Sequence, residues 1–392
     1  MKKTRKLLCL LLALVLVAGL LPGTAFAAGE TGDAEPEAAA EPDAAEEPTA
    51  QTEGIIGDLI DDLKNDPDSD AAGARTYNAT VLANVLGVQV PAIGAKITLT
   101  DQLTGESVVY STGTAGVALL KPKRADAVYS VSAEWTSLLG IKYISLPGLT
   151  WSVGVLPDLD VIHVYPVPNI GLNLTDHIAY IHGYPDGTVR PQGTLTRAEA
   201  AAMLYRIIKP SELNNTTYAA FTDIQGHWAQ TEISALANKG IIKGTSATTF
   251  SPDVPIRRQD FFTLIGRMFA KTYATSGRAG QRFSDLGSGY YVEYINMLYD
   301  LDIIKGDGNF VRPADNITRA ETAALLNRLV LRQPDADSGA PLGSQVKTWS
   351  DNPPDAWYYA DIQEASNSHN YTLNFKFGAS AYVAEVWTSI KG

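Results

Sequence analysis

The stretch TLTRAEAAAMLYRI, residues 194–207, returns twice further along the chain with little change in its chemistry. Its two other copies are PIRRQDFFTLIGRM, residues 255–268, and NITRAETAALLNRL, residues 316–329. The arginines at the same place in each copy, Arg197, Arg258 and Arg319, are 61 residues apart both times. Because repetition at a fixed interval indicates a repeat architecture, the C-terminal half is predicted to consist of copies of one small unit.

Each copy has the pattern of an amphipathic helix with its own start. Thr196 and Glu199 form a capping box, in which the hydroxyl and the carboxylate each accept a backbone N–H at the helix start. The third copy repeats this pair at Thr318 and Glu321, and apolar residues then recur at i, i+3 and i+7, the spacing of one buried face. The second copy has Arg257 in place of the threonine, so its cap is predicted to be lost.

Another helix is predicted before each repeated stretch. It covers about residues 227–239 in the second copy and 290–301 in the third, and each leads into the sequence Ile-Ile-Lys-Gly. Both helices follow an aromatic-x-Asp turn, at 221–223 and 283–285, whose aspartate fits either turn formation or ligand binding.

The first copy lacks this earlier helix, but residues beyond the third copy supply a matching one. Residues 349–351 form a further aromatic-x-Asp turn, and residues 357–365 have the pattern of a first helix with no second half. Each half-unit has an apolar face that it cannot bury alone. We therefore expect the C-terminal half-unit to pack with the N-terminal one and to close a ring of three.

The first 27 residues have the layout of a secretion signal. A basic start at residues 2–6 precedes an apolar run at 7–21 and a small-x-small cleavage site at 25–27. The single cysteine, Cys9, lies inside this segment, so the mature chain is predicted to have no disulfide. The absence of another long apolar run predicts an exported protein that does not span a membrane.

Residues 28–74 are predicted to be an extended acidic linker. The segment from Glu30 to Asp70 holds 15 acidic residues and one basic residue, so most of the net charge of −12 belongs to it. The remainder of the chain is nearly neutral, which argues against a nucleic acid partner.

Residues 75–166 have the pattern of a small antiparallel β-sandwich. Short alternating runs such as 95–100, 106–111 and 129–133 are separated by turns rich in Gly and Asp. The phrases AIGAKITLTDQLTGE, STGTAGVALL and YSVSAEW resemble prealbumin-like sandwiches of the carboxypeptidase regulatory-like and collagen-adhesin B types. A spacer role and a ligand-binding role are both compatible with this pattern.

The repeated units resemble the S-layer homology family. The residues that carry the resemblance are GYPDGTVRPQGTLTRAE (183–199), FTDIQGHWAQ (221–230), FSPDVPIRRQD (250–260), FSD (283–285) and IIKGDGNFVRPADNITRAE (303–321). The family implies an all-α, three-pronged pseudo-trimer that anchors secreted proteins non-covalently to the cell wall. The expected organisation is signal 1–27, linker 28–74, β-sandwich 75–166, repeat 1 second half 172–215, repeat 2 219–275, repeat 3 281–332 and a completing half-repeat 346–392.

The resemblance also implies a ligand, a secondary cell-wall polysaccharide whose terminal sugar carries a pyruvate ketal, bound in grooves between the prongs. Guanidinium groups hold carboxylates with paired hydrogen bonds, and aromatic faces can stack on sugars. The residues expected to bind the polysaccharide or a peptidoglycan-linked glycan are Arg197, Glu199, Arg257, Arg258, Asp260, Arg319, Glu321, Trp228, Tyr291 and Trp357.

Structural roles remain open for the same residues. The threonines and glutamates are fully explained as helix caps, and the arginines could cover the helix starts or pair with nearby aspartates. The tryptophans could belong to the core. Arg206, Arg267 and Arg328, deeper in the helices, are expected to form structural ion pairs.

No enzyme motif is present, and no cofactor or metal is expected, because the five histidines lack metal-binding spacing. The predicted function is a non-catalytic anchor on the cell surface. The alternatives are a self-associating S-layer lattice subunit and an adhesin or enzyme whose active surface lies on the β region.

Overall fold

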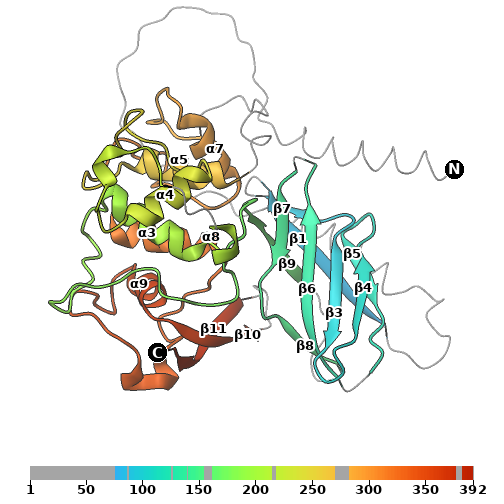
Figure 1. Cartoon of the computed structure of the whole chain (residues 1–392). Helices are drawn as coiled ribbons and strands as arrows, with labels where there is room; N and C mark the ends of the chain where they lie inside the picture. The colour runs from blue at the N-terminus through green and yellow to red at the C-terminus, as the bar shows by residue number, and fades with distance from the viewer. Residues whose placement is uncertain are drawn as a thin grey trace, which may run out of the picture. The chain divides into compact units, whose positions relative to one another are not determined.

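The computed structural model describes residues 76–85, 88–124, 127–138, 140–153, 161–213, 218–269, 282–376 and 382–391. The predicted signal and acidic linker lie outside these residues. A β-sheet region comes first and a mainly helical half follows (Figure 1), as the sequence predicts.

Nine strands make up the β region. They are β1 Tyr77–Val85, β2 Val88–Pro91, β3 Lys96–Asp101, β4 Ser107–Ser111, β5 Val117–Leu120, β6 Val128–Thr136, β7 Lys142–Ser145, β8 Thr150–Ser152 and β9 Val161–Val167. The strand order is β2-β1-β9-β7-β6-β3-β4, with β5 on β1 and β8 on β6. Along β6 every second residue from Tyr129 to Ala133 is buried, so one face of the strand supplies the core.

The prediction of a wholly antiparallel β region is wrong for one strand pair. Strands β1 and β9 run parallel, with Thr80–Ala83 aligned on Val161–Val164. These are the first and last strands of the region, and the chain between them is long enough for the crossover that a parallel pair needs. The short-range alternation in the sequence carries no information on this long-range pairing.

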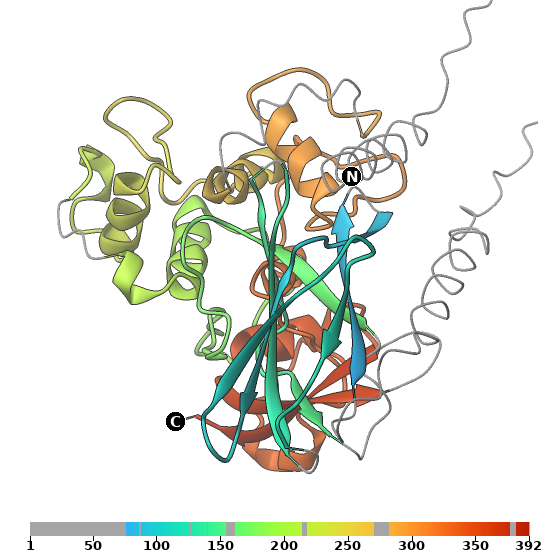
Figure 2. The same ribbon diagram turned by 90° about the vertical axis from the view of Figure 1, so that its right-hand side faces the viewer.

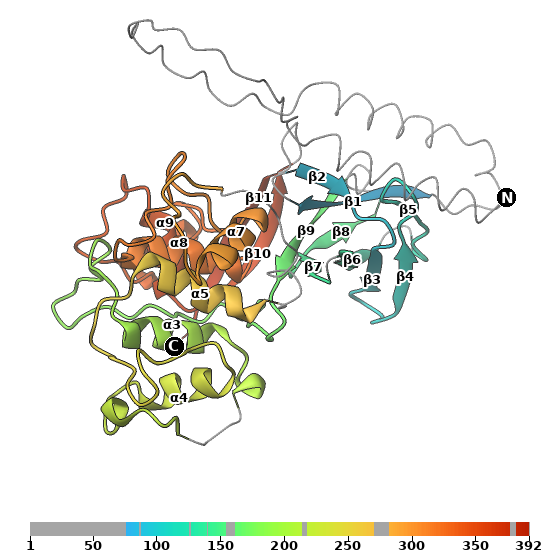
Figure 3. The same cartoon turned by 90° about the horizontal axis from the view of Figure 1, so that it is seen from above.

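Six α-helices are described in the C-terminal half. They are α3 Arg197–Ile207, α4 Gln230–Asn238, α5 Arg258–Met268, α7 Val292–Asp300, α8 Arg319–Leu329 and α9 Tyr359–Ser366, joined by short 3-10 helices at Pro210–Glu212, Thr222–Ile224 and Ala340–Gln345. Helix α3 packs against α4, α5 against α7 and α8 against α9 (Figure 3). Each pair therefore joins the second helix of one copy to the first helix of the next.

The helix starts follow the sequence prediction. Thr196 caps α3 and Thr318 caps α8, both in complete capping boxes. Arg257 stands at the N-cap of α5 without a side-chain cap, so the predicted loss of the cap is confirmed.

The sequence did not predict a β-hairpin at the end of the chain. Strands β10 (His369–Lys376) and β11 (Tyr382–Ile390) pair antiparallel directly after α9, in the red part of the chain (Figure 2).

Three backbone hydrogen bonds form a closed cycle where the three copies meet. Leu195 N–H donates to the Ile317 carbonyl at 3.0 Å, Ile256 N–H to Leu195 at 2.8 Å, and Ile317 N–H to Ile256 at 3.2 Å. The three side chains are buried. Each residue lies two positions before the first helical arginine of its copy, so the cycle holds three helix starts together.

The first two backbone N–H groups of each of these helices are also bonded to a neighbouring copy. Arg197 and Ala198 donate to Val254 and Pro252, Arg258 and Gln259 to Asp315 and Pro313, and Arg319 and Ala320 to Gly193 and Pro191. The expectation that spare N–H groups at these helix starts favour an anion is therefore wrong, because the neighbouring loop carbonyls already accept from them.

The aspartate of each aromatic-x-Asp turn accepts two successive backbone N–H groups. Asp223 accepts from Phe250 and Ser251, Asp285 from Val311 and Arg312, and Asp351 from Val189 and Arg190. The third of these contacts joins a turn beyond the third copy to the loop of the first. Hydrogen bonds from Tyr180 and Ile181 to the Ala365 carbonyl join the same two segments.

Three glycines lie directly against the aromatic residue of a turn. A methyl group added to Gly183 would come within 1.9 Å of the Trp349 ring, and additions to Gly244 and Gly306 would come within 2.6 and 2.3 Å of Phe221 and Phe283. Only a residue without a side chain fits such close contacts.

Gly183→Ala is expected to destabilise the helical half by about 3 kcal/mol or more, because the indole of Trp349 must leave a packed site. Urea denaturation followed by tryptophan fluorescence measures the loss. Gly113→Ala serves as the control, because its added methyl group meets nothing closer than 3.6 Å. Equal stability of the two variants would contradict the packing described.

Candidate functional site

The three repeated arginines all reach into a loop of another copy. The Nε–H groups of Arg197, Arg258 and Arg319 donate to the carbonyls of Phe250, Val311 and Val189, each at 2.8 Å. Arg319 also donates to the His182 carbonyl at 2.7 Å, and Arg197 to the Lys243 carbonyl at 3.1 Å. The arginines therefore tie the copies together, whatever else they bind.

The acidic partner of each arginine comes from a different helix. Arg319 pairs with Glu199 at 3.3 Å, and Arg258 pairs with Glu321 at 2.6 Å. The sequence had grouped each arginine with the acidic residue two positions later on its own helix. The structure regroups them across copies, because the helix starts face one another around the cycle.

The third arginine has the same kind of neighbour. Burial lowers the pKa of Arg197, and the negative charge of Asp260 acts against that shift. Burial likewise lowers the pKa of Arg258, opposed by Glu321. Both guanidiniums therefore lie in partly desolvated places beside one carboxylate.

A cavity of about 190 Å³ lies where these groups meet around the first copy. It is lined by His182, Tyr184, Glu199, Ala202, Met203, Arg206, Trp228 and Arg319. The Tyr184 hydroxyl donates to Glu199 at 3.1 Å, which fixes the carboxylate beside the arginine. Three residues predicted from the sequence to bind the polysaccharide, Glu199, Trp228 and Arg319, are thus brought together from three different helical regions.

The cavity is rich in positive charge. Two guanidiniums, Arg206 and Arg319, face one carboxylate, Glu199, in its lining. Burial lowers the pKa of His182, and the charges of Arg206, Lys347 and Arg319 lower it further. A neutral imidazole beside two cations leaves a net positive cavity that suits an anionic group.

Three exposed aromatic residues occupy the same place before three helices. Trp228, Tyr290 and Trp357 each stand two residues before α4, α7 and α9, and they are 58%, 59% and 64% exposed. The sequence had named Tyr291, which is the half-buried N-cap of α7 and packs against the core. Helices α4 and α7 start 62 residues apart, one more than the arginine interval, and allowing for that extra residue identifies Tyr290.

The groups around the second copy differ from those around the first. The Tyr290 hydroxyl donates a hydrogen bond to Asp260, and burial together with this bond raises the pKa of Tyr290 to about 12. Arg257 is exposed at the start of α5. An aromatic ring held by the local carboxylate and an uncapped cation therefore replace the capped arrangement of the first copy.

The deeper arginines are structural, but not through the ion pairs expected from the sequence. Arg206, Arg267 and Arg328 donate to the carbonyls of Tyr180, Ile241 and Ile303 at 3.0, 3.1 and 2.9 Å. Each closes the loop that precedes its own helix.

Three segments of the chain match the model of the S-layer homology domain, at residues 179–201, 220–262 and 282–323. They coincide with the three copies and their loops. The C-terminal half is built of S-layer homology repeats.

Curated relatives carry the same repeats. Cell surface glycoprotein 1 of Acetivibrio thermocellus is 32% identical over 210 residues, which is 50% of this chain and 9% of that protein. The cellulosome-anchoring protein of the same organism is 30% identical over 210 residues, 51% of this chain and 44% of that protein. The amylopullulanase of Thermoanaerobacterium thermosulfurigenes is 35% identical over 136 residues, 33% of this chain and 7% of that protein.

The chain spans less than half the length of each of these relatives, and the matches cover only part of it. Among the described helices, none is both long and apolar enough to cross a membrane.

Arg319→Lys is expected to lower the unfolding free energy of the helical half by about 2–3 kcal/mol, because an ammonium cannot serve both buried carbonyls and Glu199 at once. Urea denaturation measures the change. Arg312→Lys is the control, since Arg312 makes a half-exposed pair with Glu321 and its replacement is expected to leave stability nearly unchanged. Equal effects of the two substitutions would contradict the clamping role of Arg319.

Proposed function

We propose that this chain is a cell-envelope protein held non-covalently by its S-layer homology repeats, which bind a pyruvylated secondary cell-wall polysaccharide. The repeats and the relatives indicate a location at the cell surface. In this proposal the copies form a three-pronged pseudo-trimer, and residues 346–392 complete the repeat that residues 172–215 begin. The cycle through Leu195, Ile256 and Ile317 and the contacts of Asp351 support that arrangement.

The observation that carries the proposal is the composite cavity beside Trp228. An exposed indole offers a flat face to a sugar ring, while the positive lining offers a partner to a carboxylate. Arg319 uses three of its five N–H groups on Val189, His182 and Glu199, so two remain for a ligand. A pyruvate ketal on a sugar presents both chemistries in one residue of the polymer.

We extend the proposal to the two equivalent places by position. Arg197 with Asp260 and Tyr290 would form the second groove, and Arg258 with Glu321 and Trp357 the third. Arg257 would add a cation at the second groove. Three modest sites on one rigid body gain avidity on a repeating polymer without any tight single contact.

The β region is proposed to be a small sandwich that acts as a spacer or display module, and the whole chain to be non-catalytic. The names of two relatives, a cell surface glycoprotein and an anchoring protein, support this assignment. The repeats also occur in a relative named as an amylopullulanase, so they are compatible with attached enzymes.

Trp228→Ala is expected to weaken binding to purified cell walls about tenfold, and the triple replacement of Trp228, Tyr290 and Trp357 by alanine a hundredfold or more. Sedimentation with walls, before and after removal of the pyruvylated polysaccharide, measures both changes. The three side chains are more than half exposed, so folding should be retained.

Tyr218→Ala is the matched control, because Tyr218 is 61% exposed and lies outside the three aromatic positions. Undiminished sedimentation of a folded triple variant would show that these aromatic residues do not bind the wall. Unchanged sedimentation with stripped walls would exclude the polysaccharide as the ligand.

A further inference from the structure

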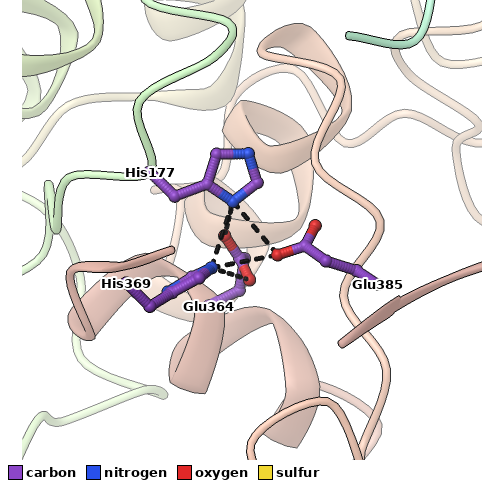
Figure 4. A group of neighbouring side chains, drawn as sticks. All are labelled: His177, Glu364, His369 and Glu385. Atoms are coloured by element: carbon purple, nitrogen blue, oxygen red, sulfur yellow. Dashed lines mark hydrogen bonds and ion pairs between the residues drawn. The ribbon is translucent and has the colours of Figure 1, made fainter. Parts of the chain in front are cut away.

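Four buried side chains converge where the C-terminal segment meets the first copy. His177 precedes the loop of the first copy, Glu364 lies in α9, His369 begins β10 and Glu385 lies in β11 (Figure 4). None of the four side chains is more than 2% exposed. The S-layer homology matches begin at residue 179 and end at residue 323, so all four residues lie outside them.

The donor atoms of these residues face a common point. Nδ1 of His177 lies 3.1 Å from Glu364 Oε1, 3.0 Å from Glu385 Oε1 and 3.1 Å from Nε2 of His369. Nε2 of His369 lies 2.9 Å from Glu385 Oε1 and 3.4 Å from Glu364 Oε2. These distances are the edges of a tetrahedron with two nitrogen and two oxygen corners.

The edge lengths match a small divalent cation. Zinc binds imidazole nitrogen and carboxylate oxygen at about 2.0–2.1 Å in tetrahedral structural sites, which places neighbouring ligand atoms about 3.3–3.4 Å apart. The five edges given above run from 2.9 to 3.4 Å. A zinc ion at the centre therefore needs only small outward movements of the four side chains.

Protons satisfy the cluster poorly. Nδ1 of His369 lies 2.9 Å from the Asn367 carbonyl, which can only accept, so the proton of a neutral ring is on Nδ1 and the Nε2 lone pair faces the cluster. Among the described residues, neither oxygen of Glu364 accepts a hydrogen bond of good geometry, although both are buried. One proton on His177 could serve a single neighbour, whereas a metal ion serves all four ligands at once.

The charge of the cluster also favours a cation. Two buried carboxylates have one guanidinium beside them, that of Arg332, which lies 3.4 Å from Glu364 and is 3% exposed. With neutral imidazoles one buried negative charge is left over, and an unbalanced buried charge is costly. A divalent cation removes that imbalance.

The surroundings hold the ligands in place. His177 stacks on Tyr371 with ring centroids 3.9 Å apart, and His369 stacks on Trp387 at 4.0 Å. The backbone N–H of Gln333 donates to the second oxygen of Glu385 at 3.3 Å. Such outer contacts orient metal ligands and fix their tautomers.

We propose that His177, Glu364, His369 and Glu385 bind one Zn²⁺ ion as a structural site. Four protein ligands leave no open position for a water or a substrate, which is the arrangement of a structural rather than a catalytic zinc. The ion would join α9 and the terminal hairpin to the segment that precedes the first copy. It would thereby lock the seam where the two ends of the helical half meet, independently of any wall ligand.

The first test uses the purified full-length secreted protein, stripped with a chelator and dialysed against Zn²⁺. Mass spectrometry of the metal content is expected to give one zinc per chain, and Co²⁺ is expected to give the strong visible absorption of a tetrahedral site. At a hundredfold excess of Zn²⁺ over Kd the melting temperature should rise by about 5–10 °C. A folded protein that retains no zinc and shows no shift overturns the proposal.

The second test compares Glu385→Gln with His227→Gln. The first substitution keeps the shape of a ligand and removes its charge, and is expected to weaken Zn²⁺ binding a hundredfold or more. The second removes a histidine that lies beside Asp253, outside the cluster, and should leave zinc content and melting shift unchanged. Equal zinc affinity of a folded Glu385→Gln variant and the wild type would overturn the assignment of these ligands.

Discussion

The hydrogen-bond cycle through Leu195, Ile256 and Ile317 sets the arrangement of the helical half. Each residue donates its N–H to one copy and accepts at its carbonyl from another, and the side chains are buried around the cycle. Breaking one bond leaves a buried donor and a buried acceptor without partners, which costs far more than an exposed bond. The three helix starts are therefore fixed relative to one another before any other contact between copies is considered.

The composite cavity follows from this constraint. Because the helix starts face one another, Arg319 reaches the loop of the first copy and pairs with Glu199. Trp228 arrives from the helix that packs on α3. No single copy contains the whole site, so ligand binding and the integrity of the ring depend on the same contacts.

Local signals in the sequence predicted local structure well. Thr196 with Glu199 gave the helix cap, Arg257 gave its loss, and the spacing of Gly and Asp gave the turns. The partners of the arginines could not be predicted, because a 61-residue period says which residues are equivalent and not which ones meet. The parallel pairing of β1 with β9 was missed for the same reason. The buried pair His177 and His369 is separated by 192 residues, which no short metal-binding motif can reveal.

Amide hydrogen exchange of the native protein tests the ring most directly. The account predicts that the N–H groups of Leu195, Ile256 and Ile317 exchange only on global unfolding of the helical half, with protection factors within about tenfold of one another. If one of the three exchanged orders of magnitude faster than the other two, the cycle would be open at that copy. The account of a single closed ring would then be contradicted.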